Sequence, residues 1–214
     1  MKFKLAIFDL DGTLMDTSSG IFATANKAVE SVGRKPEHDI KQLSKFIGPP
    51  IAQCFIHTFN LEEDLIAKAV ENYRKEYDLH GKYGAKEYPS IKETLDTLKQ
   101  RGYLLAVGTL KTEGLAISMM DHFGFSPYFS SIRGSDMNSK LSKADIVNKV
   151  LADLDIDATD AVLIGDTVHD EEGAKEANVS FIAVDYGFGF PRGQEKTDSM
   201  MAVVSHPEEL LSLL

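Results

Sequence analysis

The stretch Leu5-Ala6-Ile7-Phe8-Asp9-Leu10-Asp11-Gly12-Thr13 decides the fold, because an apolar run leads directly into two acids and a glycine. The apolar part predicts a buried strand over residues 4–8, so that Asp9 and Asp11 follow its end. Ionised carboxylates are costly to bury unless a cation or hydrogen-bond donors compensate them. In open α/β sheets, ligands bind at the carboxyl ends of the strands. We therefore interpret this stretch as a reaction centre at the edge of a sheet.

The composition is that of an ordinary globular protein with an acidic balance. A chain of 214 residues is long enough for one sizeable domain, or for a core with a small insert. The net charge of −10 disfavours nucleic acids and anionic membranes as partners. Cys54 is the only cysteine, which excludes an intramolecular disulfide and a cysteine-rich metal site. No apolar run has the length of a signal peptide core or a membrane span, so we expect a cytoplasmic protein.

Short apolar runs alternate with helical patterns through most of the chain. After residues 4–8, strands are expected at 103–107, 129–132, 161–164 and 181–184, and helices at 90–100, 112–122, 142–151 and 168–177. This alternation predicts an α/β fold with a doubly wound parallel sheet and right-handed crossovers.

Strand patterns are missing between Asp16 and Tyr88. Apolar residues recur there at helical spacing, and two shorter helices are expected around Gly48-Pro49-Pro50. The sequence therefore predicts a core of residues 1–15 and 89–214 and an all-helical insert of residues 16–88. Because the insert begins directly after the acidic stretch, we interpret it as a lid that excludes water. The alternative is a helical bundle without a role in catalysis.

Further polar features follow the expected strands or begin the expected helices. Thr109 follows the strand at 103–107, Lys143 follows Ser142 at a helix start, and Asp166 and Asp170 follow the strand at 161–164. A parallel sheet gathers all these positions at one edge. Asp9, Asp166 and Asp170 form an oxygen-rich set that suits Mg²⁺ better than zinc.

Taken in order, these features resemble the haloacid dehalogenase-like phosphatases. That family carries an Asp-x-Asp-Gly-Thr strand end, a Thr or Ser, a Lys and an acidic pair, with a helical cap often placed where this insert lies. The resemblance covers essentially the whole chain. It implies a Rossmann-like core and phosphoryl transfer through an aspartyl-phosphate. Residues 46–51, Phe-Ile-Gly-Pro-Pro-Ile, resemble the cap loop of the phosphoglycolate phosphatase-like branch, which includes some nucleotidases.

The resemblance also implies roles for the acids. Asp9 corresponds to the nucleophile, and Asp11 to the acid that protonates the leaving oxygen and later activates water. Asp9 and Asp166 would bind Mg²⁺ directly, and Asp11 through its backbone carbonyl. Asp170 would bind the metal either directly or through water.

The phosphate would be held by Gly12, Thr109, Leu110 and Lys143. Gly12 lets the backbone approach closely, and Thr109 offers a hydroxyl. Leu110 stands where Asn or Ser is common in the family, so only its N–H is expected to contribute.

Lys143 is expected to neutralise Asp9 and a phosphate oxygen. Ser142 and Asp145 have the spacing of a capping box. A lysine at the first helical residue opposes the helix dipole, which calls for a functional reason. Lys140 is the alternative position for this cation.

Two neighbouring features are interpreted as structural. His169 is expected to face solvent. Residues 186–189, Tyr-Gly-Phe-Gly, are interpreted as a turn with aromatic packing rather than a ligand site.

The leading hypothesis is a Mg²⁺-dependent phosphatase for a small, phosphoglycolate-like phosphomonoester, acting as a monomer or weak homodimer. A 5'-nucleotidase and a phosphoglucomutase-like phosphotransferase are alternatives on the same core. Dehalogenase and phosphonatase activities are disfavoured because Asp11 is present. The complete set of catalytic groups also disfavours a non-enzymatic regulatory domain.

Overall fold

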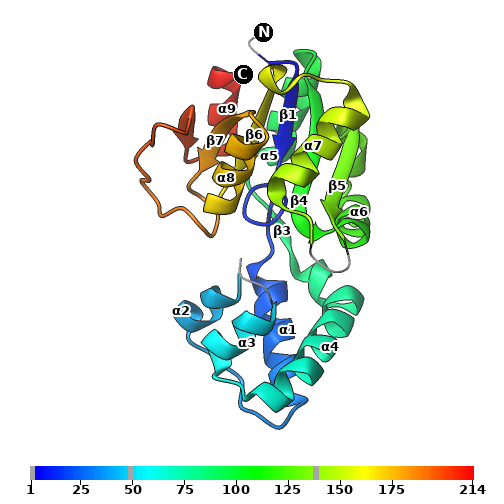
Figure 1. Cartoon of the computed structure of the whole chain (residues 1–214), viewed down its shortest axis with the longest axis vertical. Helices are drawn as coiled ribbons and strands as arrows, with labels where there is room; N and C mark the ends of the chain where they lie inside the picture. Colours follow the sequence, from blue (N-terminus) through cyan, green and yellow to red (C-terminus); the bar gives the residue numbers. More distant parts are fainter. Residues whose placement is uncertain (1–2, 48–50, 137–139) are drawn as a thin grey trace. The chain divides into compact units, whose positions relative to one another are not determined.

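The computed structural model describes residues 3–47, 51–136 and 140–214 (Figure 1). The chain divides into two compact units, one of Met1–Met15 with Glu87–Leu214 and the other of Asp16–Lys86. Two short strands, β2 (Met15–Asp16) and β3 (Lys86–Glu87), contain the points at which the chain passes from one unit to the other.

A six-stranded sheet with the order β5-β4-β1-β6-β7-β8 organises the larger unit, and its strand pairs are parallel. The strands are β1 (Leu5–Phe8), β4 (Leu104–Thr112), β5 (Ser131–Ser135), β6 (Ala161–Gly165), β7 (Ser180–Val184) and β8 (Ala202–Val204). Because β1 lies between β4 and β6, the order of the sheet reverses at β1. Such a reversal is where ligands bind in open α/β sheets.

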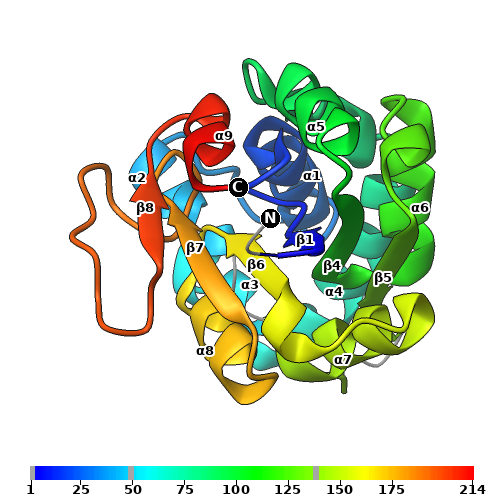
Figure 2. The same ribbon diagram turned by 90° about the horizontal axis from the view of Figure 1, so that it is seen from above.

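Helices cover both faces of the sheet (Figure 2). One face carries α7 (Lys143–Leu154) and α8 (Val168–Glu176), and the other carries α5 (Ile91–Gln100) and α9 (Leu210–Leu213). The remaining helix of this unit, α6 (Glu113–His122), packs against β4 and β5. This architecture confirms the predicted α/β, doubly wound core.

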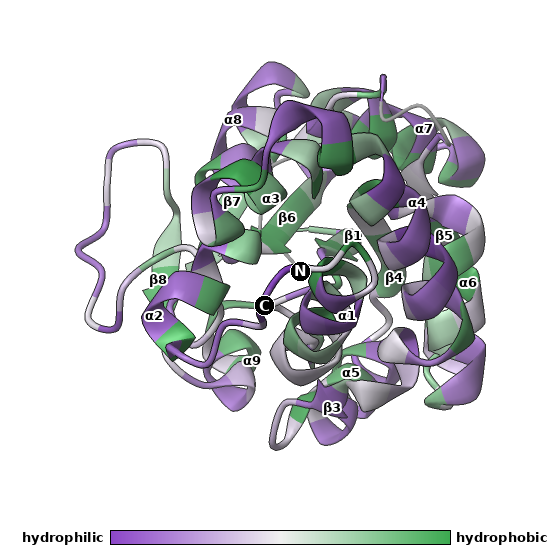
Figure 3. Ribbon diagram, turned by 90° about the horizontal axis from the view of Figure 1, so that it is seen from below, coloured by the Kyte–Doolittle hydropathy of each residue, from purple (hydrophilic) through white to green (hydrophobic). Residues whose placement is uncertain are grey.

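The central strands are buried on both sides, as their continuous apolar sequences require. Leu5 and Ile7 of β1 join the cluster formed with Val147 of α7 and Ala174 of α8. Figure 3 shows the hydrophobic colour along β1 and β6, while the helices alternate between hydrophobic and hydrophilic residues. Each fully buried Leu or Ile side chain contributes about 1.5–3 kcal/mol. The first polar side chain after β1 therefore emerges from a rigid core.

The strands differ most clearly from the sequence-based expectation at β4, β5 and β8, and β5 covers Ser131–Ser135 instead of residues 129–132. β4 continues to Thr112, because it pairs again with Ser135 of β5 after a register shift that follows Gly108. β8 was not expected, since its three residues are too few to show a periodic pattern.

The smaller unit consists of α1 (Ser18–Glu30), α2 (Ile40–Leu43), α3 (Ile51–Phe59) and α4 (Glu63–Leu79). α4 packs against α1 and α3. The core of the smaller unit contains five aromatic residues, Phe46, Phe55, Phe59, Tyr73 and Tyr77. The expected turn at Gly48-Pro49-Pro50 lies outside the described residues.

Short 3-10 helices complete the described chain: η1 (Ser44–Phe46), η2 (Gly81–Gly84), η3 (Ser126–Tyr128), η4 (Ala158–Asp160) and η5 (Pro207–Glu209). No helix within the described ranges has both the length and the apolar character needed to span a membrane.

Candidate active site

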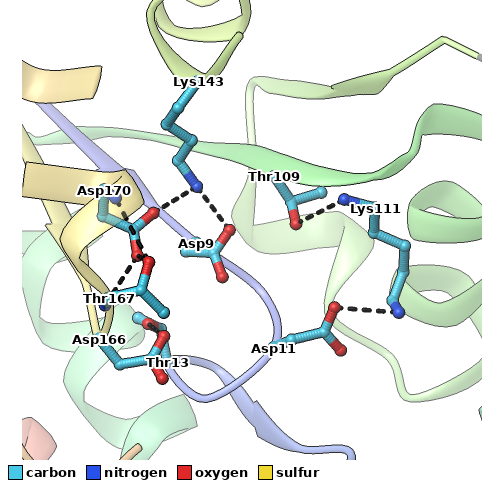
Figure 4. Close-up of polar contacts among 9 residues, drawn as sticks. All are labelled: Asp9, Asp11, Thr13, Thr109, Lys111, Lys143, Asp166, Thr167 and Asp170. Carbon is cyan, nitrogen blue, oxygen red and sulfur yellow. Dashed lines mark hydrogen bonds and ion pairs between the residues drawn. The ribbon is translucent and has the colours of Figure 1, made fainter. Parts of the chain in front are cut away.

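Asp9 is the first polar side chain after β1, and only 7% of the residue is exposed. Its N–H donates to the carbonyl of Ile164 at 2.9 Å, which extends the pairing with β6 by one residue. The Nζ of Lys143 lies 2.6 Å from Oδ1 of Asp9 (Figure 4). The end of the central strand thus holds a buried carboxylate against a buried cation.

Lys143 is positioned by the start of α7. The hydroxyl of Ser142 accepts the N–H of Asp145 at 3.1 Å, and Oδ2 of Asp145 accepts the N–H of Ser142 at 2.9 Å. This capping box confirms the predicted helix start. The ammonium of Lys143 lies 2.6 Å from Oδ1 of Asp170 as well as from Asp9. Burial alone would lower the pKa of Lys143, but Asp170 and Asp9 outweigh it and raise the pKa above its ordinary value.

Two more buried acids come from β6 and α8. Asp166 directly follows β6, and Asp170 belongs to the first turn of α8. Oδ2 of Asp170 accepts the N–H of Thr167 at 3.0 Å and its hydroxyl at 2.7 Å, which fixes the carboxylate. One oxygen from each of Asp9, Asp166 and Asp170 lies within 4.8 Å of the others. The structure therefore brings together the side chains expected at a metal site, with Lys143 beside them.

The cluster contains more negative than positive charge, and its pKa values reflect this. Burial raises the pKa of Asp9 to about 6, opposed by Lys143 and assisted by repulsion from Asp170 and Asp11. Burial, with repulsion from Asp9 and Asp170, raises the pKa of Asp166 to about 8. Three carboxylates against one ammonium favour the binding of a further cation, and oxygen-only ligands favour a hard divalent ion.

Backbone donors after β7 hold Asp166 in place. The N–H groups of Phe188 and Gly189 donate to its Oδ2 at 2.7 and 3.3 Å. The hydroxyl of Tyr186 donates to the carbonyl of Thr13 at 3.1 Å. Aromatic packing is present as expected, with the ring centroids of Tyr186 and Tyr88 4.7 Å apart. The amides of Phe188 and Gly189 add a role that the sequence analysis did not include, because they support a carboxylate of the acidic cluster. Two glycines at the carboxyl end of a parallel strand were the available signal.

Glycines leave the space that the charged side chains occupy. A Cβ at any of four positions would overlap one of these side chains: Gly12 and Gly187 against Asp166, Gly165 against Asp170, and Gly173 against Lys143. At Gly12 the backbone also has a φ of +83°, which favours glycine. The carboxylates are therefore closely surrounded by backbone.

Asp11 has a partner that sequence reasoning missed. Its Oδ2 lies 2.9 Å from Nζ of Lys111 in β4. Its Oδ1 is buried and has no hydrogen-bond partner among the described residues. The Lys111 side chain is only 10% exposed. Lysines are mostly solvent-exposed, so the sequence carried no signal for this contact.

Thr109 lies within β4, the strand beside β1, and its side chain is buried. Its hydroxyl accepts the N–H of Lys111 at 3.3 Å. The Leu110 side chain is exposed. His169 is also exposed, in agreement with its expected orientation toward solvent. The expected roles of Gly12, Thr109 and Leu110 in phosphate binding remain predictions.

Comparisons with known proteins identify the family of this chain. The family described as haloacid dehalogenase-like hydrolase matches residues 6–184. A 5'-nucleotidase from Pseudomonas aeruginosa is 35% identical over 88% of this chain and 86% of its own length. A phosphoglycolate phosphatase from Vibrio parahaemolyticus is 29% identical over 86% of this chain and 85% of its own. A solved haloacid dehalogenase-like hydrolase from Streptococcus pneumoniae has a TM-score of 0.89 and 31% identity, covering 99% of this chain and 98% of its own. The chain belongs to the haloacid dehalogenase-like hydrolase family.

Proposed function

We propose that the protein is a Mg²⁺-dependent phosphatase that hydrolyses a small phosphomonoester through an aspartyl-phosphate on Asp9. The main support for this proposal is the buried cluster of charged side chains at the end of β1. There, oxygens of Asp9, Asp166 and Asp170 lie within 4.8 Å of one another, and the ammonium of Lys143 bridges two of these acids. Membership of a hydrolase family supports the proposal.

The donor set fits Mg²⁺. It consists of carboxylate oxygens, and Mg²⁺ prefers oxygen ligands. Asp9 and Asp166 would bind it directly, Asp11 through its backbone carbonyl, and Asp170 directly or through water. When bound, Mg²⁺ would neutralise charge on the phosphoryl oxygens.

The side chains divide the chemistry between them. The carboxylate of Asp9 attacks phosphorus, while Lys143 orients it and offers its ammonium to a phosphoryl oxygen. Asp11 gives a proton to the leaving oxygen, and later takes one from the water that hydrolyses the aspartyl-phosphate. Gly12, the hydroxyl of Thr109 and the N–H of Leu110 bind the phosphoryl group.

A phosphoglycolate-like ester is the first candidate substrate, and the relative from Vibrio parahaemolyticus supports it. Nucleoside monophosphates are the second candidate, supported by the relative from Pseudomonas aeruginosa. We propose that the helical unit Asp16–Lys86 acts as a cap that selects the leaving group.

Phosphate release from p-nitrophenyl phosphate, 2-phosphoglycolate and nucleoside monophosphates tests the proposal. Activity is expected with Mg²⁺ and is lost in EDTA. Asp9→Asn should abolish turnover without changing the far-UV circular dichroism, whereas Asp198→Asn, at an exposed acid, is the matched control. Full activity of Asp9→Asn, or turnover without a divalent cation, would contradict the mechanism. Transfer of phosphate to a second metabolite instead of water would indicate a phosphotransferase.

A further inference from the structure

We propose that Lys111 recognises a negative charge on the leaving group, close to the ester oxygen. The site would then select phosphate esters of small hydroxycarboxylic acids, of which 2-phosphoglycolate is the simplest, over esters of uncharged alcohols. This inference rests on the proposed phosphatase function and assigns the residue that would distinguish between its two candidate substrates.

The position of Lys111 carries the argument. Its Nζ lies 2.9 Å from Oδ2 of Asp11. A general acid must come within hydrogen-bond distance of the oxygen that it protonates. With Asp11 in that role, the Lys111 ammonium lies one hydrogen bond away from the group that faces the leaving oxygen. In 2-phosphoglycolate a single methylene separates that oxygen from a carboxylate, which brings the carboxylate within reach of this ammonium. In a nucleoside monophosphate the same oxygen is bonded to an uncharged sugar.

The net negative charge of the occupied site calls for a cation beside the leaving group. Four carboxylates, those of Asp9, Asp11, Asp166 and Asp170, are accompanied by the ammonium groups of Lys143 and Lys111. A bound divalent ion would balance these charges, and the dianionic phosphate would then make the occupied site negative. An additional carboxylate on the leaving group would be repelled unless a cation met it directly.

Lys143 cannot be that cation. Its side chain is 3% exposed, and its ammonium is held at 2.6 Å by both Asp9 and Asp170. Figure 4 shows Lys143 directed at these two acids and Lys111 directed at Asp11. Among the described residues of the larger unit, Lys111 is the cation that contacts Asp11, the acid that serves the leaving group.

The Lys111 ammonium can exchange its present partner, the Asp11 carboxylate, for a carboxylate of the substrate. An incoming substrate carboxylate would replace one charge-assisted hydrogen bond to the ammonium by another, so the cation would stay paired. Asp11 is partly exposed, and its release from Lys111 would allow it to turn toward the leaving oxygen.

The test compares two esters that differ in one group. These are 2-phosphoglycolate and 2-hydroxyethyl phosphate, in which a hydroxymethyl group replaces the carboxylate. The quantity measured is the ratio of kcat/KM for the two esters with Mg²⁺. Lys111→Met removes the charge, Lys111→Gln is a second neutral variant, and Lys111→Arg keeps the charge. Lys149→Met removes an equal charge from an exposed position in α7 and serves as the matched control.

The wild-type enzyme should prefer 2-phosphoglycolate. The ratio should fall about 10- to 100-fold in Lys111→Met and Lys111→Gln, the value of a hydrogen bond to a charged group. Lys111→Arg should retain most of the preference, and Lys149→Met all of it. In the Asp9→Asn background, calorimetry should show the same selective loss of 2-phosphoglycolate binding when Lys111→Met is added.

An unchanged ratio in the neutral variants would overturn the inference, even if both activities fell, because a uniform loss means that Lys111 acts only on Asp11. A wild-type preference for 2-hydroxyethyl phosphate would also overturn it and would leave the phosphatase function intact. If wild type hydrolysed no phosphomonoester with Mg²⁺, the proposed function would fail, and the inference with it.

Discussion

Removing divalent cations should make the stability of this protein fall as the pH rises from about 5 to about 8. Burial raises the pKa of Asp166 to about 8 and that of Asp9 to about 6, from the ordinary aspartate value of 3.8. At a pH between 3.8 and the raised pKa of each acid, the folded protein holds a proton that the unfolded chain has released. A rise in pH through this window therefore favours unfolding. Lys143 does not change this window, because its pKa is raised above the already basic value of 10.5 and it stays charged in both states.

The expected loss is large for a single site. One extra proton held by the folded state changes the free energy of unfolding by about 1.4 kcal/mol per pH unit. Asp166 keeps its proton until the pH approaches 8 and contributes a loss of about 4 kcal/mol, and Asp9 adds about 1 kcal/mol up to pH 6. A whole domain is stable by only about 5–15 kcal/mol. Metal-free protein should therefore be markedly weakened at pH 8.

Urea unfolding in EDTA at several values between pH 5 and pH 8 measures this loss. Far-UV circular dichroism is the suitable signal, since the chain has no tryptophan. Addition of Mg²⁺ should reduce the loss, because the ion binds the ionised carboxylates of the folded state. Asp166→Asn, which mimics the protonated acid, should remove most of the slope. A free energy of unfolding that stays constant or rises between pH 6 and pH 8 in EDTA would refute the reasoning, as would an unchanged slope in Asp166→Asn.

Three substitutions probe the groups around the cluster. Lys143→Met leaves the buried carboxylate of Asp9 without its cation and should cost about 3–5 kcal/mol in urea unfolding at pH 7; a cost below about 1 kcal/mol would contradict the pairing. Gly12→Ala places a Cβ against Asp166 and should weaken Mg²⁺ binding at least about tenfold by calorimetry, and unaltered affinity would show that the loop adjusts freely. Ser142→Ala removes an N-cap and should cost about 1 kcal/mol, and a thermal midpoint equal to wild type would contradict this.

The parts predicted from the sequence are those that leave a local signature. The apolar run of β1 followed by Asp9 identified the central strand and its carboxyl end. Ser142 and Asp145 identified the start of α7, because capping depends on residues three apart in the chain. Residues that follow parallel strands lie at the same edge of the sheet. Asp166 could therefore be predicted to lie near Asp9 before any contact between them was known.

The parts that were missed depend on contacts between distant segments. Lys111 meets Asp11 because β4 continues past the irregularity after Gly108, which no local pattern reveals. The backbone N–H groups of Phe188 and Gly189 donate to Asp166. Because almost every residue has such a donor, the sequence does not distinguish the two that make this contact. These contacts become visible only when the chain is folded.

The glycines around the acidic cluster limit how proteins with this site can diverge. At Gly12, Gly165, Gly173 and Gly187 any larger residue competes for volume with a charged group. Amino-acid substitutions at these four positions should therefore be eliminated by selection before a new substrate preference could arise. Evolution toward other substrates must therefore proceed through positions outside this set. A directed-evolution library that keeps these four codons constant should lose few viable variants and concentrate its diversity where specificity can change.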